Sequence, residues 1–301
     1  MADNLVLMGG GCAGVGQLGL AKELWKRNRV PKKIQGVSVG ALNGAALVAG
    51  GPDYLEKTWL DLEQRSSSFV FNWSKVPLRI FKSSLFSDWG LDFLVSNIDI
   101  KAAIDSPIEF EVVVCNESLG RKKEVVSNRD PRFAGDPELF RQFIKASSAL
   151  PGFFPPVLIG GHWYSDGYRF NLNTMADCDN LFVVLNDKPI PDDVSRWHWA
   201  KRLFTGFNYV LNNLIEEEIE NFLEHHKAFN RFKIDSPLPF LQRLFESAKD
   251  FVGIGPKQLI VISPSYNIPT LGLDTFGRGD ITLAIQKSSQ QAEDFLNKLD
   301  Q

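Results

Sequence analysis

One short segment combines a serine with flanking glycines in a spacing typical of nucleophilic catalysis, Gly36-Val37-Ser38-Val39-Gly40. In a G-x-S-x-G pattern the serine sits on a strained turn between a strand and a helix, and the glycines avoid clashes with the backbone beside them. The unpaired N–H groups and dipole of the following helix favour a developing negative charge. The segment predicts acyl-transfer chemistry with Ser38 as the nucleophile, although an ordinary Gly/Ser turn would give the same pattern.

A second glycine segment, Gly9-Gly10-Gly11-Cys12-Ala13-Gly14, comes earlier in the chain. Peptide N–H groups of Gly9, Gly10 and Gly11 could converge on the oxyanion of an acyl-transfer intermediate, because a loop without side chains lets the substrate approach closely. The same glycines match the G-x-G-x-x-G fingerprint of dinucleotide binding, which also needs an acidic residue about 20 positions later. Residues 29–43 contain no Asp or Glu. A nucleotide-binding module is therefore the less favoured alternative.

A serine nucleophile needs a base, which is usually a histidine. The four histidines, at positions 162, 198, 225 and 226, stand before a turn or in a helical region, where we expect surface or core residues. Asp166 lies between a short strand and Gly167, in a setting that could bring it close to a site. A buried carboxylate could accept the Ser38 proton directly, because burial raises its basicity. An aspartate that only caps a turn is the other interpretation.

The sequence around these motifs predicts the elements that position them. Short apolar runs typical of buried parallel strands occur at 4–8, 33–37, 108–115, 181–185 and 258–262. Helical spacing follows the first glycine segment up to Pro31, and further helices are expected at 41–49, 199–229 and 280–299. The strand–helix alternation predicts an α/β fold, with a mostly parallel central sheet between two layers of helices.

Composition and charge exclude several classes of protein. The chain has 301 residues, of which 44% are hydrophobic, so one large core is expected rather than disorder. The net charge of -3 gives no electrostatic footprint for nucleic acid. The three cysteines, at positions 12, 115 and 178, are scattered and suggest neither a disulfide framework nor a zinc site.

Residues 34–52 form an uncharged stretch long enough to span a bilayer. Its spaced glycines suit a tight strand-to-helix turn better than a membrane helix. The start of the chain lacks the basic and apolar regions of a signal peptide. We therefore expect a cytoplasmic protein, with peripheral membrane attachment or export without a signal peptide left open.

Three segments together resemble the patatin-like phospholipase family of lipid acyl hydrolases, which use a Ser-Asp dyad. They are GGGCAG at 9–14, GVSVGALNGAA at 36–46, and KASSALPGFFPPV at 145–157 followed by YSDGYRFNLN at 164–173. The resemblance implies a single three-layer αβα domain over 1–301, with a helical insertion at about 189–255 before the last strand. It also implies that Ser38 is the nucleophile, Asp166 the base, and Gly9, Gly10 and Gly11 the oxyanion loop, without a metal or other cofactor.

Two positions depart from the family pattern. Ala13 stands where a Lys or Arg is common, so positive charge near the oxyanion must come from elsewhere. Tyr168 replaces the small third residue of the aspartate motif, and we expect it to narrow the site or to alter the acyl group accepted. These departures leave open a catalytically silent scaffold.

The resemblance implies a phospholipid or another acyl ester as substrate, of phospholipase A or lysophospholipase type. Residues 69–93 interleave aromatic and basic side chains, which is typical of a surface that touches anionic lipid. An aromatic cap over the sheet is the favoured interpretation for most of these residues. Residues 232–251 are a second candidate for a lid or an acyl-channel wall.

Overall fold

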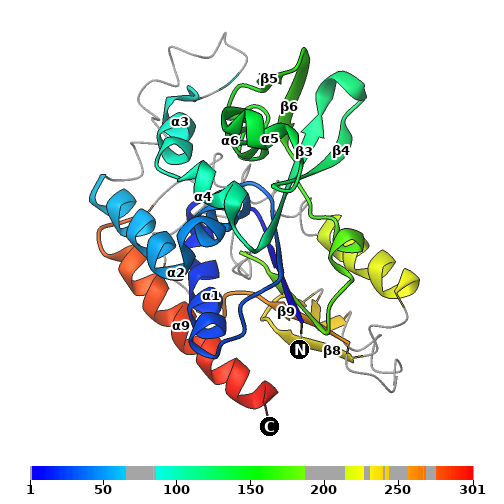
Figure 1. The fold of residues 1–301 in the computed structure, drawn as a ribbon. Helices are drawn as coiled ribbons and strands as arrows, with labels where there is room; N and C mark the ends of the chain where they lie inside the picture. Colours follow the sequence, from blue (N-terminus) through cyan, green and yellow to red (C-terminus); the bar gives the residue numbers. More distant parts are fainter. Residues whose placement is uncertain are drawn as a thin grey trace, which may run out of the picture.

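A nine-stranded sheet with helices on both faces forms the protein (Figure 1). The computed structural model describes residues 2–65, 84, 86–186, 214–226, 231–239, 241–243, 257–266, 268 and 276–300. The strands are β1 (Asp3–Leu7), β2 (Lys33–Gly36), β3 (Glu109–Asn116), β4 (Lys122–Ser127), β5 (Val157–Ile159), β6 (His162–Asp166), β7 (Asn180–Val184), β8 (Arg231–Asp235) and β9 (Gln258–Ile262).

The labelled helices are α1 (Gln17–Lys26), α2 (Val39–Arg65), α3 (Trp89–Ser96), α4 (Ile100–Asp105), α5 (Arg132–Gly135), α6 (Pro137–Ser147) and α9 (Asp280–Leu299). Within the described residues, the short 3-10 helices are η1 (Gly11–Gly16), η4 (Glu117–Leu119) and η5 (Leu172–Met175). Residues 214–225 form a further helix.

The sheet is mostly parallel and has the strand order β5-β6-β3-β2-β1-β7-β9-β8, with β4 paired to β3. Strands β2, β1, β7, β9 and β8 run parallel to one another and to β3. The β4, β6 and β5 pairings are antiparallel. The chain leaves β1 toward β2 and later returns to β7 on the other side of β1. Loops after the carboxyl ends of these three strands therefore meet at one edge, where open α/β sheets bind ligands.

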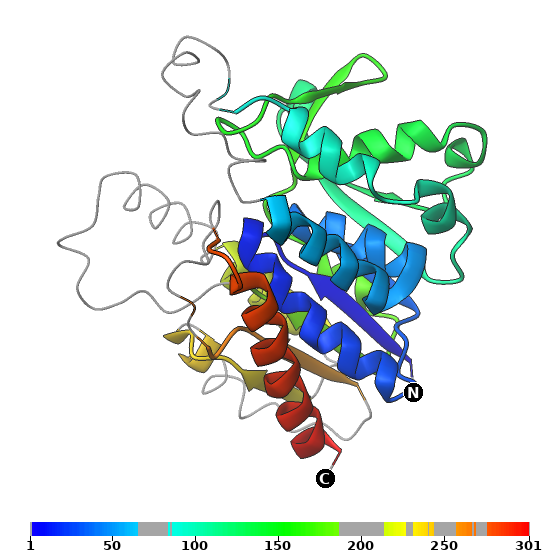
Figure 2. The same ribbon diagram turned by 90° about the vertical axis from the view of Figure 1, so that its left-hand side faces the viewer.

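Alternating side chains of each central strand enter two different apolar cores. In β1, Leu5 and Leu7 pack on the side of α1, α2 and α9, whereas Val6 and Met8 pack on the side of η5 and the 214–225 helix. Figure 2 shows α1, α2 and α9 next to one another in front of the sheet. This burial on both faces explains why the central strands are continuous apolar runs.

The predicted fold class is confirmed, and all five predicted strands are present within one or two residues of their expected ends. The uncharged stretch 34–52 is not one helix but β2, a turn and the first half of α2, which is kinked at Gly51. Within the described ranges, no helix is both long and apolar enough to cross a bilayer.

The helical insertion predicted at about 189–255 lies largely outside the described residues. Its described part contains the helix at 214–225 and also β8, a strand that the sequence did not predict. Charged and apolar residues alternate in β8, which pairs with β9 alone at the end of the strand order.

Candidate active site

Ser38 occupies a sharp turn between β2 and α2. Its φ of 58° is in the left-handed region that non-glycine residues rarely adopt. A side chain at Gly36 would clash with the Gly40 carbonyl, and one at Gly40 would clash with the Leu7 carbonyl of β1. Glycine is therefore required on both sides of Ser38. Such strain persists only where the surrounding structure holds it, and it is common at functional sites.

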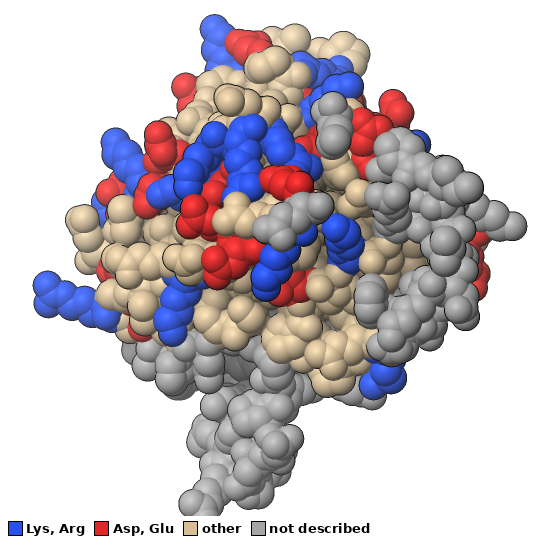
Figure 3. All heavy atoms as spheres, turned by 90° about the horizontal axis from the view of Figure 1, so that it is seen from below, with Lys and Arg blue, Asp and Glu red and all other residues tan. Residues whose placement is uncertain are grey.

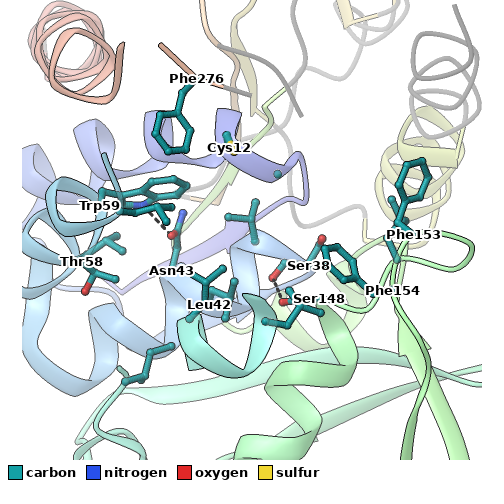
Figure 4. Close-up of a pocket in the computed structure, with 18 residues that line it drawn as sticks. Cys12, Ser38, Leu42, Asn43, Thr58, Trp59, Ser148, Phe153, Phe154 and Phe276 are labelled. Carbon is teal, nitrogen blue, oxygen red and sulfur yellow. Dashed lines mark hydrogen bonds between the residues drawn. The ribbon is translucent and has the colours of Figure 1, made fainter. Parts of the chain in front are cut away.

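Two further serines, at the end of α6, hold the strained turn. The Ser38 N–H donates to Ser147 Oγ (3.1 Å), and Ser147 Oγ donates to the Val113 carbonyl of β3 (2.7 Å). Ser148 Oγ donates to the Ser38 carbonyl at 3.1 Å, as the dashed line in Figure 4 marks. Sequence reasoning did not assign roles to Ser147 and Ser148. The available signal was two adjacent serines at the end of an amphipathic helix, which alone does not identify their partners.

Strand β3 brings Asp166 to Ser38, although 128 positions separate them in the chain. Gly36, at the end of β2, pairs with Val112 of β3. Asp166, at the end of β6, pairs with Val114, which lies two residues further along β3. The two strands therefore occupy successive stretches of β3, and their ends meet. The Ser38 hydroxyl lies close enough to the Asp166 carboxylate to lower its pKa.

Asp166 is almost completely buried, with 2% of its surface exposed. Burial raises the pKa of this carboxyl from 3.8 to about 7, while the Tyr168 N–H and the Ser38 hydroxyl act in the opposite direction. The Tyr168 N–H donates to Asp166 Oδ1 at 2.8 Å and orients the carboxylate. A carboxylate with a pKa near neutrality is suited to taking up and releasing a proton at physiological pH.

The glycine loop between β1 and η1 lies beside Ser38. A Cβ on Gly9 would be 2.9 Å from Ser38 Cβ and 3.5 Å from Ser38 Oγ. Gly11 lines the same cavity as Ser38. Gly10 and Gly11 have positive φ values of 148° and 56°, conformations that favour glycine. The structure thus brings Gly9 and Gly11 to Ser38, with Gly10 between them.

Two buried amide side chains determine the direction of the peptide groups in this loop. Asn186, just after β7, donates from Nδ2 to the carbonyls of Met8 (2.8 Å) and Gly9 (2.9 Å). Gln17 Nε2 also donates to the Met8 carbonyl (2.6 Å). In a trans peptide the C=O and the next N–H point in opposite directions. The N–H groups of Gly9 and Gly10 therefore point away from Asn186. Asn186 follows β7 and Ser38 follows β2, on opposite sides of β1, so these N–H groups are directed toward the Ser38 side.

An apolar cavity of about 100 Å³ has Ser38 in its wall (Figure 4). Helix α2 contributes more of the lining than any other element. The glycine loop and η1, α3 and the residues after it, the segment after α6, and Phe276 contribute the other residues beside Ser38. Among the polar groups, Asn43 Oδ1 accepts from the Trp59 indole N–H (3.0 Å), and Asn43 Nδ2 donates to the Gly14 carbonyl (2.9 Å). Since these groups are paired with one another, the cavity suits a hydrocarbon chain.

Two of the described histidines have other partners. His226 Nε2 is 3.0 Å from Asn173 Oδ1, and His225 Nδ1 is 2.6 Å from the Asn221 carbonyl. His162 does not line the cavity, and His198 lies outside the described residues. Across the described ranges, no group of three His, Cys, Asp or Glu residues could hold a metal ion.

Tyr168 does not narrow the described cavity, and its expected effect on the acyl group accepted stays a prediction. It is absent from the described lining, and its hydroxyl interacts electrostatically with Asp166 and, at the β3–β4 hairpin, with Cys115, Glu117 and Arg121. Burial raises the pKa of this hydroxyl. Its φ of 61° is unusual for a tyrosine and turns its N–H toward Asp166. Tyr168 therefore orients Asp166 through its backbone N–H, and its hydroxyl also interacts electrostatically with that carboxylate.

Comparison with known proteins adds information independent of this geometry. A sequence model described as "Patatin-like phospholipase" matches residues 5–178, which is more than half of the chain and includes Ser38 and Asp166. A search of curated proteins gives no match.

Two solved structures are similar to this chain. A crystal structure of VipD from Legionella pneumophila is 12% identical over 99% of this chain and 67% of that one, with a TM-score of 0.45. A crystal structure of the type III effector protein ExoU is 11% identical over 97% of this chain and 53% of that one, with a TM-score of 0.35. The chain thus spans about two thirds of the first protein and about half of the second.

Proposed function

Since the chain belongs to the patatin-like phospholipase family, whose members hydrolyse lipid acyl esters, we propose that it cleaves such esters with Ser38 and Asp166 as a catalytic dyad. The observation that carries this proposal is the proximity of the Ser38 hydroxyl, on its strained turn, to the buried Asp166 carboxylate, whose pKa it lowers. A nucleophile in contact with its base, with a third group orienting the base, is the arrangement that covalent catalysis needs. Here the Tyr168 N–H is the orienting group.

In the first step, Ser38 Oγ attacks the ester carbonyl while its proton passes to Asp166. The negative charge that develops on the carbonyl oxygen is stabilised by the N–H groups of Gly9 and Gly10, with those of Gly11 and Val39 close by. Val39 is the first residue of α2, so its N–H has no acceptor within the helix. Donors fixed before the reaction need no reorganisation, which makes this stabilisation effective.

The tetrahedral intermediate then collapses. Asp166 returns its proton to the leaving alcohol, and an acyl group remains on Ser38. In the second half, water gives a proton to Asp166 and attacks the acyl carbonyl, and the acid departs as Ser38 recovers its proton. The pKa of about 7 supports this role, because Asp166 must both accept and donate within one cycle.

The cavity supports an acyl chain as the group held beside Ser38. Its size also suggests an upper limit, since a cavity of roughly 150 Å³ holds one benzene molecule. A space of about 100 Å³ accommodates only a few carbon atoms, so we propose that the described cavity takes the first part of the chain. Ala13 supplies no charge for a phosphate group. Phospholipase A or lysophospholipase specificity is part of this proposal.

Hydrolysis of p-nitrophenyl esters and of mixed-chain phospholipids tests the proposal in the wild type, Ser38→Ala and Asp166→Asn. Both variants are expected to lose at least about 100-fold in kcat, as removal of a nucleophile or a general base does. Ser106→Ala replaces a buried serine that does not line the cavity, so it is the matched control and should retain activity.

Equal product release by the wild type and Ser38→Ala would refute the dyad. An inactive wild type with every substrate, together with unchanged folding, would instead support the catalytically silent scaffold. Tight binding of a nucleotide to the wild type would favour the glycine loop as a nucleotide site.

A further inference from the structure

Two hairpins extend past the edge of the sheet at which Ser38 lies. Strand β3 pairs with β4 on one side and β6 on the other, and β6 pairs with β5. The β3–β4 turn and the β5–β6 turn both lie beyond Asn116, at the carboxyl end of β3. Asn116 is four residues past Val112, the partner of Gly36, or about 13 Å along the strand. The hairpins stand above the body of the sheet in Figure 1.

The tips of these hairpins expose an unusual share of the apolar surface. Among the described residues, six large hydrophobic side chains are exposed, and three of them are Leu119 (53%), Leu158 (53%) and Trp163 (47%). Leu158 and Trp163 are direct partners in the β5–β6 pairing, so their side chains share one face. The Trp163 N–H donates to Ser118 Oγ at 2.9 Å, which places Leu119 in the adjoining turn.

Basic residues lie beside these apolar side chains. Arg121 and Lys122 follow directly in the β3–β4 turn, are exposed, and form no ion pair with a described residue. Glu117 is the acidic residue of the turn, while Lys123 pairs with Glu218 at 3.3 Å. We call Leu119, Arg121, Lys122, Leu158 and Trp163 the tip patch.

We propose that the tip patch docks the protein on an anionic lipid surface. Tryptophan favours the boundary between head groups and acyl chains, leucines enter the upper acyl region, and Arg and Lys are attracted to anionic head groups. The surface at the other end of the sheet differs from the tip patch. At the opposite end of the strands, Lys and Arg alternate with Asp and Glu over the visible described surface (Figure 3).

The position of the tip patch fits the proposed function, on which this inference rests. Docking through the hairpin tips turns the carboxyl edge of the sheet toward the lipid. A lipid ester leaving the surface then reaches Ser38 without passing around the sheet. The aromatic and basic segment 69–93, proposed from sequence as a lipid surface, lies partly outside the described residues. Of its described aromatic residues, Phe86 is buried, Phe93 is half-buried and Trp89 is exposed.

Vesicle sedimentation tests the proposal in the Ser38→Ala background, where hydrolysis does not alter the lipid. Vesicles contain either phosphatidylcholine alone or phosphatidylcholine with about 30% phosphatidylserine. We expect Ser38→Ala to bind the anionic vesicles more strongly. Adding Leu158→Ser and Trp163→Ser together should lower the partition coefficient between vesicle and water at least about ten-fold. Arg121→Gln and Lys122→Gln should each lower it about five-fold at low salt, with little effect at about 1 M salt.

Matched substitutions elsewhere separate this surface from others. Leu283→Ser, on the exposed side of α9, and Trp89→Ser, on α3, should bind as the parent does. Leu119→Ser lies in the turn itself, so it keeps the test informative if Trp163→Ser unfolds. Thermal unfolding midpoints identify any variant that has lost its fold.

Unchanged binding of the folded tip variants would overturn the proposal, as would failure of the parent to bind either vesicle. Weakened binding of Trp89→Ser alone would place the lipid surface on the 69–93 segment instead. The measurement needs no catalysis, so failure of docking and failure of the hydrolase proposal are distinguishable. Hydrolysis of a soluble ester tests only the latter.

Discussion

Burial of Asp166 has a consequence for stability that needs no substrate to test. In the native protein its pKa is about 7, compared with an ordinary value of 3.8. Between these values the folded chain binds more protons than the unfolded chain, so its stability falls as the pH rises. The full difference corresponds to about 4 kcal/mol, of which about 2 to 3 kcal/mol falls between pH 5 and pH 8.

Asp166→Asn removes this dependence while preserving the contacts. The asparagine Oδ1 can still accept from the Tyr168 N–H, and its Nδ2 can donate to Ser38 Oγ. Urea unfolding of both proteins at a series of pH values gives the difference in their free energies of unfolding. We expect this difference to move in favour of Asp166→Asn by about 2 to 3 kcal/mol from pH 5 to pH 8.

Asp130 provides a control of opposite sign, because Arg132 lowers the pKa of its half-buried carboxyl. Any stability that Asp130 contributes is lost only as the pH falls below its ordinary range. The difference between the wild type and Asp130→Asn should therefore be constant from pH 5 to pH 8. A constant difference for Asp166→Asn as well would refute the claim that a buried, proton-binding carboxyl faces Ser38.

Three further predictions concern activity. The kcat/KM for a soluble ester should rise with pH to a plateau above about pH 7, as Asp166 loses its proton, and a rate independent of pH from 5 to 8 would contradict its role as base. Asn186→Ala frees the carbonyls that orient the oxyanion loop, so kcat should fall about 10- to 100-fold with KM little changed, whereas a change confined to KM would argue against positioning. Leu62→Ala enlarges the cavity and should raise the ratio of kcat/KM for longer over shorter acyl esters, while the core variant Leu24→Ala should leave that ratio unchanged.

The parts of the fold that could be predicted are those with strong local patterns. The central strands are buried on both faces and are therefore continuous apolar runs, which single-sequence reasoning detects. Strands β4 and β8 mix charged and apolar residues, so their sequences do not differ clearly from those of surface loops. Their pairing with β3 and β9 depends on contacts distant in the chain.

In the candidate site, too, the features with a local sequence pattern could be predicted, and those that depend on contacts distant in the chain could not. Gly36 and Gly40 could be predicted as a pair, because the turn around Ser38 excludes side chains on both sides. The contact between Ser38 and Asp166 was inferred from a family resemblance, and only the shared pairing with β3 explains it physically. Asn186 was not predicted, because an asparagine after a strand carries no signal that its amide will reach the β1 loop.

Reactivity of Ser38 is the central claim, and a fluorophosphonate probe measures it most directly. The intact protein is incubated with the probe, digested, and the adduct is located by mass spectrometry. The proposed dyad predicts one adduct per chain, on Ser38, formed at least about 100-fold more slowly in Asp166→Asn. An adduct on another residue, or ester hydrolysis by a protein whose Ser38 stays unlabelled, would contradict the account.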